Sequence, residues 1–578
     1  MKNIKNIYRK LILVSVLISG MFITSCDDYL TIIPPEKLVH EDFWRTEAEV
    51  TGYTATAYAT LCNNNTLTRA IVWGESRSQS VDCKVGQYTD AFENLFNGLL
   101  YDDHPYSSWS EYYSAISACN LVMEYGPNVT SKDPNFSNAE MVIIEGEMLA
   151  LRAYAHFMLL RAFCNIPLAT KVVMSDAEIP SYPQESPMTV LNSIYSDLES
   201  ASTKVLLSSA PNVGSVGRIT TNAVYALMAD VDMWRAAFSE YYRISGIEEA
   251  AYPADTYYEM AIQNCRKILA SMHEIYCEEV EKEEERTAYS LLENDNDKKE
   301  GDKDPRKFGF SRVYNQIFGN GNSLESIFEF QIIKDNFGKS SGIAAFYGSD
   351  GKKNSPLFVS KKFVDIFDDN DLRKYAFTTY PNSNWNVQET SGDYYVNKYH
   401  AKNTPNDATN TREFRTADDY DANWIVYRKT DIMLLMAEAL VARSYADNAA
   451  LNEAYEIVKA INARWMVDGI SKLEYTTKED CMKLVRDERA RELCFEGKLW
   501  FDIVREALQT PHDKRGTLVA GYNTKVSHGA DKDELVMRFT RISSLFMPIH
   551  KDEMRFNKEL VQNESCTTSG GDDYIDQN

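Results

Sequence analysis

Three glutamates in the C-terminal part of the chain have the spacing best suited to acid–base chemistry. Glu488, Glu492 and Glu496 recur every four residues, so they share one face wherever the segment is helical. Two carboxyl groups across a cleft could hydrolyse a glycosidic bond, one acting as general acid and the other as base or nucleophile. Three arginines interleave with them: Arg486, Arg489 and Arg491. Since acid–base pairs usually come from different elements, we interpret the cluster as an ion-pair network and predict no enzyme activity.

Other catalytic and metal-binding patterns are incomplete. None of the eight histidines has zinc-ligand spacing, and no H-E-x-x-H occurs. Gly338-Lys339-Ser340 resembles the end of a P-loop, but Ile333 stands where its first glycine should be. We therefore expect no metal and no cofactor.

Cys26 indicates a different chemistry, covalent lipidation. A basic stretch, residues 1–10, precedes an apolar run at 11–23 that is shorter than the roughly 20 residues a membrane-spanning helix needs. The run ends in Ile23-Thr24-Ser25-Cys26, which resembles a bacterial lipobox, in which the cysteine is acylated and becomes the first residue. The following Asp27-Asp28 resembles a surface-export signal. We expect an outer-membrane protein, lipid-anchored and surface-exposed.

The net charge limits the kinds of binding partner, and the number of cysteines limits the disulfides that can form. The formal net charge is −24, and removal of a signal peptide with four basic residues and no acidic ones makes it more negative still. Such a surface repels nucleic acid, so we expect no nucleic-acid partner. Nine cysteines follow Cys26. Because nine is odd and no C-x-x-C occurs, we expect mostly free, buried thiols, with Cys265–Cys277 the first pair to consider for a bridge.

Helical periodicity dominates the segments that must position these residues. Apolar side chains recur at spacings of three and four through 140–163. Similar patterns predict helices at 109–125, 188–205, 221–243, 254–273, 427–446, 449–466 and 478–496. Thr476-x-x-Glu479 predicts a capping box at the start of the last helix. Residues 278–304 are charged and 305–426 are rich in Gly, Asn, Ser and aromatic residues, with a strand-like piece at 326–333.

Several motifs resemble those of the SusD/RagB family. Residues 488–505, ERARELCFEGKLWFDIVR, resemble its E-R-x-x-E-L-x-F-E-G-x-R-W-x-D-L-x-R signature, with Lys498 in place of the usual arginine. DIMLLMAEA at 431–439 resembles a second family motif. In the N-terminal half the resemblance continues in CDDYL at 26–30, in the block from Trp109 to Asn120, and from Glu147 to Leu168.

This resemblance implies a fold and a function. The implied fold is mostly α, with tetratricopeptide-like helix pairs and a loop-rich ligand-binding region. We expect a signal peptide at 1–25, a lipidated extended segment at 26–45, helical regions at 46–277 and 427–578, and the loop-rich region at 278–426. Members capture oligosaccharides and deliver them to a SusC-like TonB-dependent transporter. RagB-like members bind peptides instead. The alternatives for this chain are therefore a peptide-binding lipoprotein of the same import system, a surface glycosidase, and a structural plug without a ligand.

Sugar recognition needs aromatic faces, which stack on C–H groups, and amides or carboxylates, which bind hydroxyls. The resemblance implies that the ligand aromatics lie in loops between the first helices and in the middle region. The resulting candidate ligand-binding residues are Trp73, Tyr88, Phe92, Asn94, Phe346, Tyr347, Asp350, Trp385 and Tyr394. Trp109 and Trp500 belong to the family motifs, and we expect both to pack in the core.

Overall fold

The computed structural model describes most of the chain. The described residues are 43–83, 90–173, 182–249, 252–280, 287–293, 312–332, 342–347, 356–378, 394–400, 415, 420–523 and 531–567.

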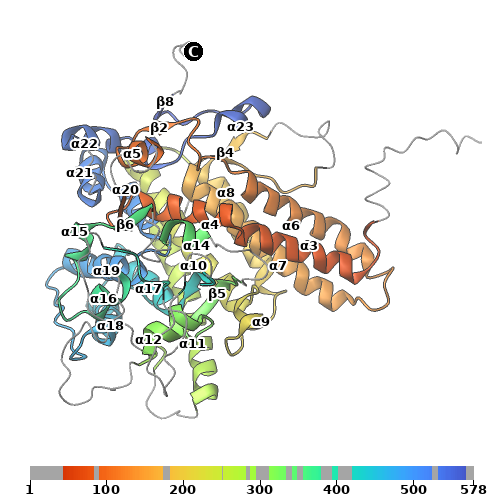
Figure 1. The fold of residues 1–578 in the computed structure, drawn as a ribbon, viewed down its shortest axis with the longest axis horizontal. Helices are drawn as coiled ribbons and strands as arrows, with labels where there is room; N and C mark the ends of the chain where they lie inside the picture. The colour runs from red at the N-terminus through yellow and green to blue at the C-terminus, as the bar shows by residue number, and fades with distance from the viewer. Residues whose placement is uncertain are drawn as a thin grey trace, which may run out of the picture.

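Long helices form one array in which each helix packs against the next (Figure 1). In chain order they are α3 (Glu47–Cys62), α6 (Ser110–Val129), α7 (Asn138–Phe163), α8 (Pro187–Ser202), α10 (Thr221–Ser245), α11 (Ala254–Val280), α17 (Lys429–Ala442), α18 (Asn448–Trp465) and α19 (Lys478–Leu493). The predicted helices are confirmed, and the mostly α fold with them. The observed ends differ from the predicted ones by a few residues, as expected where side-chain caps rather than periodicity end a helix.

Local sequence explains where these helices begin and end. Ser137 caps α7: its side chain accepts a hydrogen bond from the Glu140 amide, and the Glu140 carboxylate accepts one from the Ser137 amide. The predicted capping box of α19 is displaced by one residue, because Thr477, rather than Thr476, caps the helix together with Asp480. At the other end of α10, Gly246 adopts a φ of +67°, a left-handed conformation that costs glycine little.

Shorter elements surround the array. The short helices are α4 (Asn64–Ile71), η2 (Val72–Ser76), α5 (Asp90–Phe96), α9 (Val213–Val216), α12 (Arg312–Tyr314), η5 (Asn315–Asn320), α14 (Gly342–Tyr347), α15 (Lys361–Val364), α16 (Leu372–Thr378), α20 (Leu499–Leu508), α21 (His512–Tyr522), α22 (Lys532–Thr540), η7 (Ile542–Leu545) and α23 (Lys551–Phe556). Figure 1 shows the C-terminal α21 and α22 beside α5 from the N-terminal part.

The strands form two-stranded ribbons that join distant parts of the chain. β1 (Val81–Cys83) pairs antiparallel with β6 (Leu357–Val359), and β2 (Leu100–Tyr101) pairs parallel with β8 (Cys566–Thr567). The other two ribbons are β3 (Ile166–Pro167) with β4 (Gln184–Glu185), and β5 (Ser326–Phe330) with β7 (Trp424–Arg428). The predicted strand near 326 is therefore confirmed as β5.

One hydrophobic core runs through the molecule, from Trp44 to Leu560. The nine cysteines after Cys26 are all free, and most of them are buried, as predicted. Cys265 and Cys277 cannot bridge, because both lie on α11 and 12 residues of helix separate them by about 18 Å. In the part of the chain that the structure describes, no helix combines the length and apolarity needed to cross a membrane.

Candidate functional site

The structure places two of the candidate aromatic residues in the core. Trp73 is fully buried on η2, where its indole N–H donates to the Tyr106 carbonyl at 2.8 Å. Tyr347 on α14 is 1% exposed and lies parallel to Tyr399, with ring centroids 6.3 Å apart. A ring without an exposed face cannot stack on a ligand, so burial argues against direct contact for both. Trp109 and Trp500 are buried, as predicted.

Two further candidates meet although they lie far apart in the sequence. Phe92 on α5 and Phe346 on α14 contact edge to face, with ring centroids 5.8 Å apart, and Tyr106 contacts both. Phe92 and Phe346 are buried, so this aromatic base, Phe92, Phe346 and Tyr106, supports the surface from below and offers no exposed Phe ring to a ligand. Asn94, on the same helix as Phe92, is half-buried. The segments named from the sequence therefore do converge, but their largest rings face inward.

Beside this base, the ribbon of β1 and β6 presents a partly exposed side. Val81, Cys83, Leu357 and Val359 are buried, so alternation turns the half-buried Asp82 and Phe358 to the opposite side. Asp82 and Phe358 are register partners, which brings their Cβ atoms to roughly 5 Å of each other. A carboxylate next to an aromatic ring is a combination that suits a sugar.

Two tyrosines lie beside this ribbon. Tyr394, a predicted site residue, forms a bridge with Val359, whose amide donates to the Tyr394 carbonyl at 2.7 Å. Both Tyr394 and the following Tyr395 are half-buried. Because bridge partners point to the same side of a ribbon, the Tyr394 side chain lies on the buried side with Val359 and packs against the core. Alternation turns the following Tyr395 to the side of Phe358. We call the group Asp82, Phe358 and Tyr395 the β1–β6 face. Sequence reasoning missed Asp82 and Phe358, because only the pairing of strands about 275 residues apart, as in Asp82 with Phe358, brings them together.

Four predicted site residues lie outside the described residues: Cys26, Tyr88, Asp350 and Trp385. Within the described ranges, no group of three or more His, Cys, Asp or Glu side chains is placed to hold a metal ion.

The glutamate cluster of the C-terminal motif is a buried ion-pair network, as predicted. Arg373 on α16 donates to Glu488 at 2.7 Å and to Glu492 at 3.0 Å, and Arg428 pairs with Glu492 and Glu496. Burial raises the pKa of each glutamate, but the surrounding cations outweigh it and hold all three pKa values below the usual range. A general acid needs the opposite shift, so these carboxyl groups do not form a glycosidase pair.

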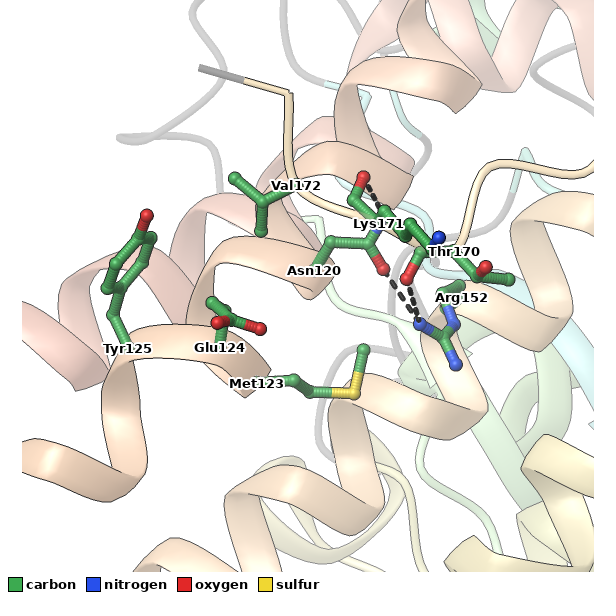
Figure 2. A pocket seen from close by; sticks show the side chains of 8 residues that line it. All are labelled: Asn120, Met123, Glu124, Tyr125, Arg152, Thr170, Lys171 and Val172. Carbon is green, nitrogen blue, oxygen red and sulfur yellow. Dashed lines mark hydrogen bonds between the residues drawn. The ribbon is translucent and has the colours of Figure 1, made fainter. Parts of the chain in front are cut away.

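A pocket of about 510 Å³ lies between α6, α7 and the segment that follows α7 (Figure 2). Its lining residues are Asn120, Met123, Glu124, Tyr125, Arg152, Thr170, Lys171 and Val172. The groups on its floor already bond one another. The Arg152 guanidinium donates two hydrogen bonds to the Asp197 carboxylate, at 2.8 and 2.7 Å, and one to the side-chain oxygen of Asn120 at 2.8 Å. Asn120 in turn donates to the Ala169 and Lys171 carbonyls.

This bonding gives Asn120 and Arg152 a structural role. Both belong to the N-terminal motifs, and together they hold the segment after α7 against α6. Because their polar atoms are used within the protein, these two residues have little left to offer a ligand. We take the β1–β6 face, which combines a carboxylate with aromatic rings, as the candidate site.

Comparisons with known proteins agree with this architecture. Residues 292–565 match the model of the SusD family, and residues 28–233 match a model described as "Starch-binding associating with outer membrane". The SusD-like protein P38 of Formosa agariphila is 25% identical over 529 residues, covering 87% of this chain and 92% of that protein.

Solved structures share the fold. A SusD homologue from Bacteroides thetaiotaomicron has a TM-score of 0.64 at 18% identity, over 91% of this chain and 98% of that one. The surface glycan-binding protein A of the same species, solved with laminarihexaose, has a TM-score of 0.61 at 17% identity, over 90% of this chain and 99% of that one. Motifs, fold and the two family matches lead to one conclusion: this chain belongs to the SusD/RagB family.

Proposed function

We propose that this protein is a cell-surface lipoprotein that binds an oligosaccharide on its β1–β6 face and delivers it to a SusC-like TonB-dependent transporter without altering it. The observation that carries the proposal is the register pairing of Asp82 with Phe358 on the partly exposed side of the ribbon. The laminarihexaose complex of a protein with the same fold supports a glycan as the ligand class.

Each group on the face has a role in this proposal. The Phe358 ring stacks against the C–H side of a sugar, and the Asp82 carboxylate accepts hydrogen bonds from hydroxyl groups. Tyr395 adds a ring with a polar tip, which suits a half-wet surface. The middle region, 278–426, thus supplies two of the three residues.

Modest affinity fits capture followed by release. A binding free energy of about −4 to −8 kcal/mol, or millimolar to micromolar Kd, retains a ligand briefly without opposing its transfer. Acyl chains on Cys26 would keep the protein beside its transporter, so tethering rather than tight binding raises the ligand concentration at the pore. Mass spectrometry of protein extracted from membranes tests the anchor, and an unacylated N-terminus would contradict it.

Calorimetric titration with a panel of oligosaccharides and peptides tests the ligand class. We expect binding to at least one oligosaccharide and its recovery unchanged by chromatography. Binding to peptides alone would favour a RagB-like peptide-binding function. Recovery of shortened oligosaccharides after incubation with the protein would indicate a glycosidase.

A matched pair of phenylalanine variants tests the site. Phe358→Ala should weaken glycan binding about tenfold, because it removes the stacking ring. Phe556→Ala is the control, since this ring on α23 is 88% exposed and lies outside the β1–β6 face. Equal affinity in both variants would refute the assignment of the face.

A further inference from the structure

The turn that follows α19 is hydrogen-bonded to Glu75 and to Lys398, which lie in two different segments next to the β1–β6 face. In this turn, Cys494–Gly497, Phe495 and Gly497 have positive φ values of 66° and 68°. The fully buried Glu75 of η2 accepts hydrogen bonds from the amides of Phe495 at 2.9 Å and Gly497 at 3.2 Å. Because turn and carboxylate lie about 420 residues apart in the chain, these bonds join its N- and C-terminal parts.

From Glu75 the connection continues into the strands. The Ser80 hydroxyl donates to the Glu75 carboxylate, and Ser80 is the residue before β1. The Ser80 carbonyl accepts from the amide of Ser360, the residue after β6, at 2.9 Å. One buried carboxylate therefore holds the end of the ribbon at which β1 begins and β6 ends.

On its other side the same turn holds the segment that begins with Tyr394. Lys398 is fully buried, and its ammonium group donates to the Glu496 carboxylate at 2.6 Å. It also donates to the carbonyls of Glu492 at 2.7 Å and Cys494 at 2.9 Å. All three donors of the ammonium are thus used on the turn and on the end of α19.

We propose that Glu75 and Lys398 are positioning residues for ligand binding, which set the geometry of the β1–β6 face through the turn Cys494–Gly497. This inference rests on the proposed function, since it assumes that the face is the ligand site. Two three-residue strands are too short to hold their own geometry, so anchors outside the ribbon must define it. Buried polar groups whose hydrogen bonds are all made suit that task, because moving either one leaves a buried polar atom without its partner.

A matched pair of cation variants separates positioning from general stability. Lys398→Met removes the contact to the turn. Arg464→Met removes another buried cation of the same network, which pairs with Glu492 at 2.9 Å and Glu325 at 2.6 Å. Both variants should lose thermal stability.

The readout is a fluorine label on the face. We would place 4-fluorophenylalanine at Phe358 in the otherwise unchanged protein and record its ¹⁹F resonance, together with glycan affinity, well below the melting temperature of each variant. We expect Lys398→Met to shift or broaden the resonance and to weaken binding at least fivefold. Arg464→Met should leave the resonance in place and the affinity within twofold.

Ser80→Ala provides a milder test if Lys398→Met does not fold. It removes the bond from Ser80 to Glu75 and should move the same resonance. An unchanged resonance in both Lys398→Met and Ser80→Ala, or an equal shift in Arg464→Met, would overturn the inference. The resonance needs no ligand, so it tests positioning even if no glycan binds, whereas absence of glycan binding by the wild-type protein would instead refute the proposed function.

Discussion

Replacing Gly74 by alanine should disrupt the contact between η2 and the turn Cys494–Gly497. A Cβ atom at this position would lie 1.8 Å from the Gly497 carbonyl oxygen and 2.4 Å from its carbon. Contacts under 3.0 Å do not occur at real Cβ atoms, so the two backbones must separate by about 1.2 Å. Neither side can yield cheaply, since both colliding groups are backbone.

The size of the effect follows from the bonds that this separation stretches. Glu75 would lose good geometry to the amides of Phe495 and Gly497, and hydrogen bonds to a charged group contribute about 1.5–3 kcal/mol each. We therefore expect Gly74→Ala to lower the free energy of unfolding by about 3–6 kcal/mol. In a chain this long, 1 kcal/mol corresponds to about 1 °C in Tm, so the expected fall is about 3–6 °C.

Differential scanning calorimetry measures this change, and Gly52 on α3 supplies the control. No atom lies within 4 Å of a Cβ built at Gly52, and alanine favours a helix by about 1 kcal/mol over glycine. Gly52→Ala should therefore raise Tm slightly. If Gly74→Ala melted within 1 °C of the wild type, the close backbone contact, and with it the role of the turn, would be refuted.

Three further predictions concern charges and caps. Burial raises the pKa of Glu75 to about 7, although hydrogen bonds from Ser80 and Phe495 lower it. Since the folded state holds this proton more tightly than the unfolded chain, its contribution is complete below pH about 4.5 and falls by about 3 kcal/mol as the pH rises through 7. Denaturant titrations should show a flatter pH dependence for Glu75→Gln across this window, and an unchanged slope would contradict the assignment. Glu492→Gln should cost about 3 kcal/mol, because it leaves the guanidinium groups of Arg373 and Arg428 undercompensated in the core. Glu456→Gln, at an exposed pair on α18, should change Tm by less than 1 °C, and equal Tm values for the two variants would count against the network. Thr477→Ala should cost about 1 kcal/mol and speed amide hydrogen exchange in the first turn of α19 alone, and unaltered exchange there would argue against the cap.

The sequence by itself determined the elements that depend on neighbours along the chain. The helices at 138–163 and 221–245 follow from apolar side chains every three or four residues, and this pattern needs no distant partner. The motif at 488–505 was also local, so both the family and the ion-pair nature of its glutamates could be predicted. The free thiols followed from their number and from helical surroundings.

Only the tertiary structure decided which side chains are available to a ligand. Trp73 and Phe358 are both aromatic residues, and the sequence alone does not indicate which of the two is exposed. In the structure Trp73 is fully buried and Phe358 is half-buried. The pairing of β1 with β6 also joins strands about 275 residues apart, and no local pattern encodes such a register. Exposure and strand pairing depend on what the rest of the chain packs against each segment, and that is decided when the whole chain folds.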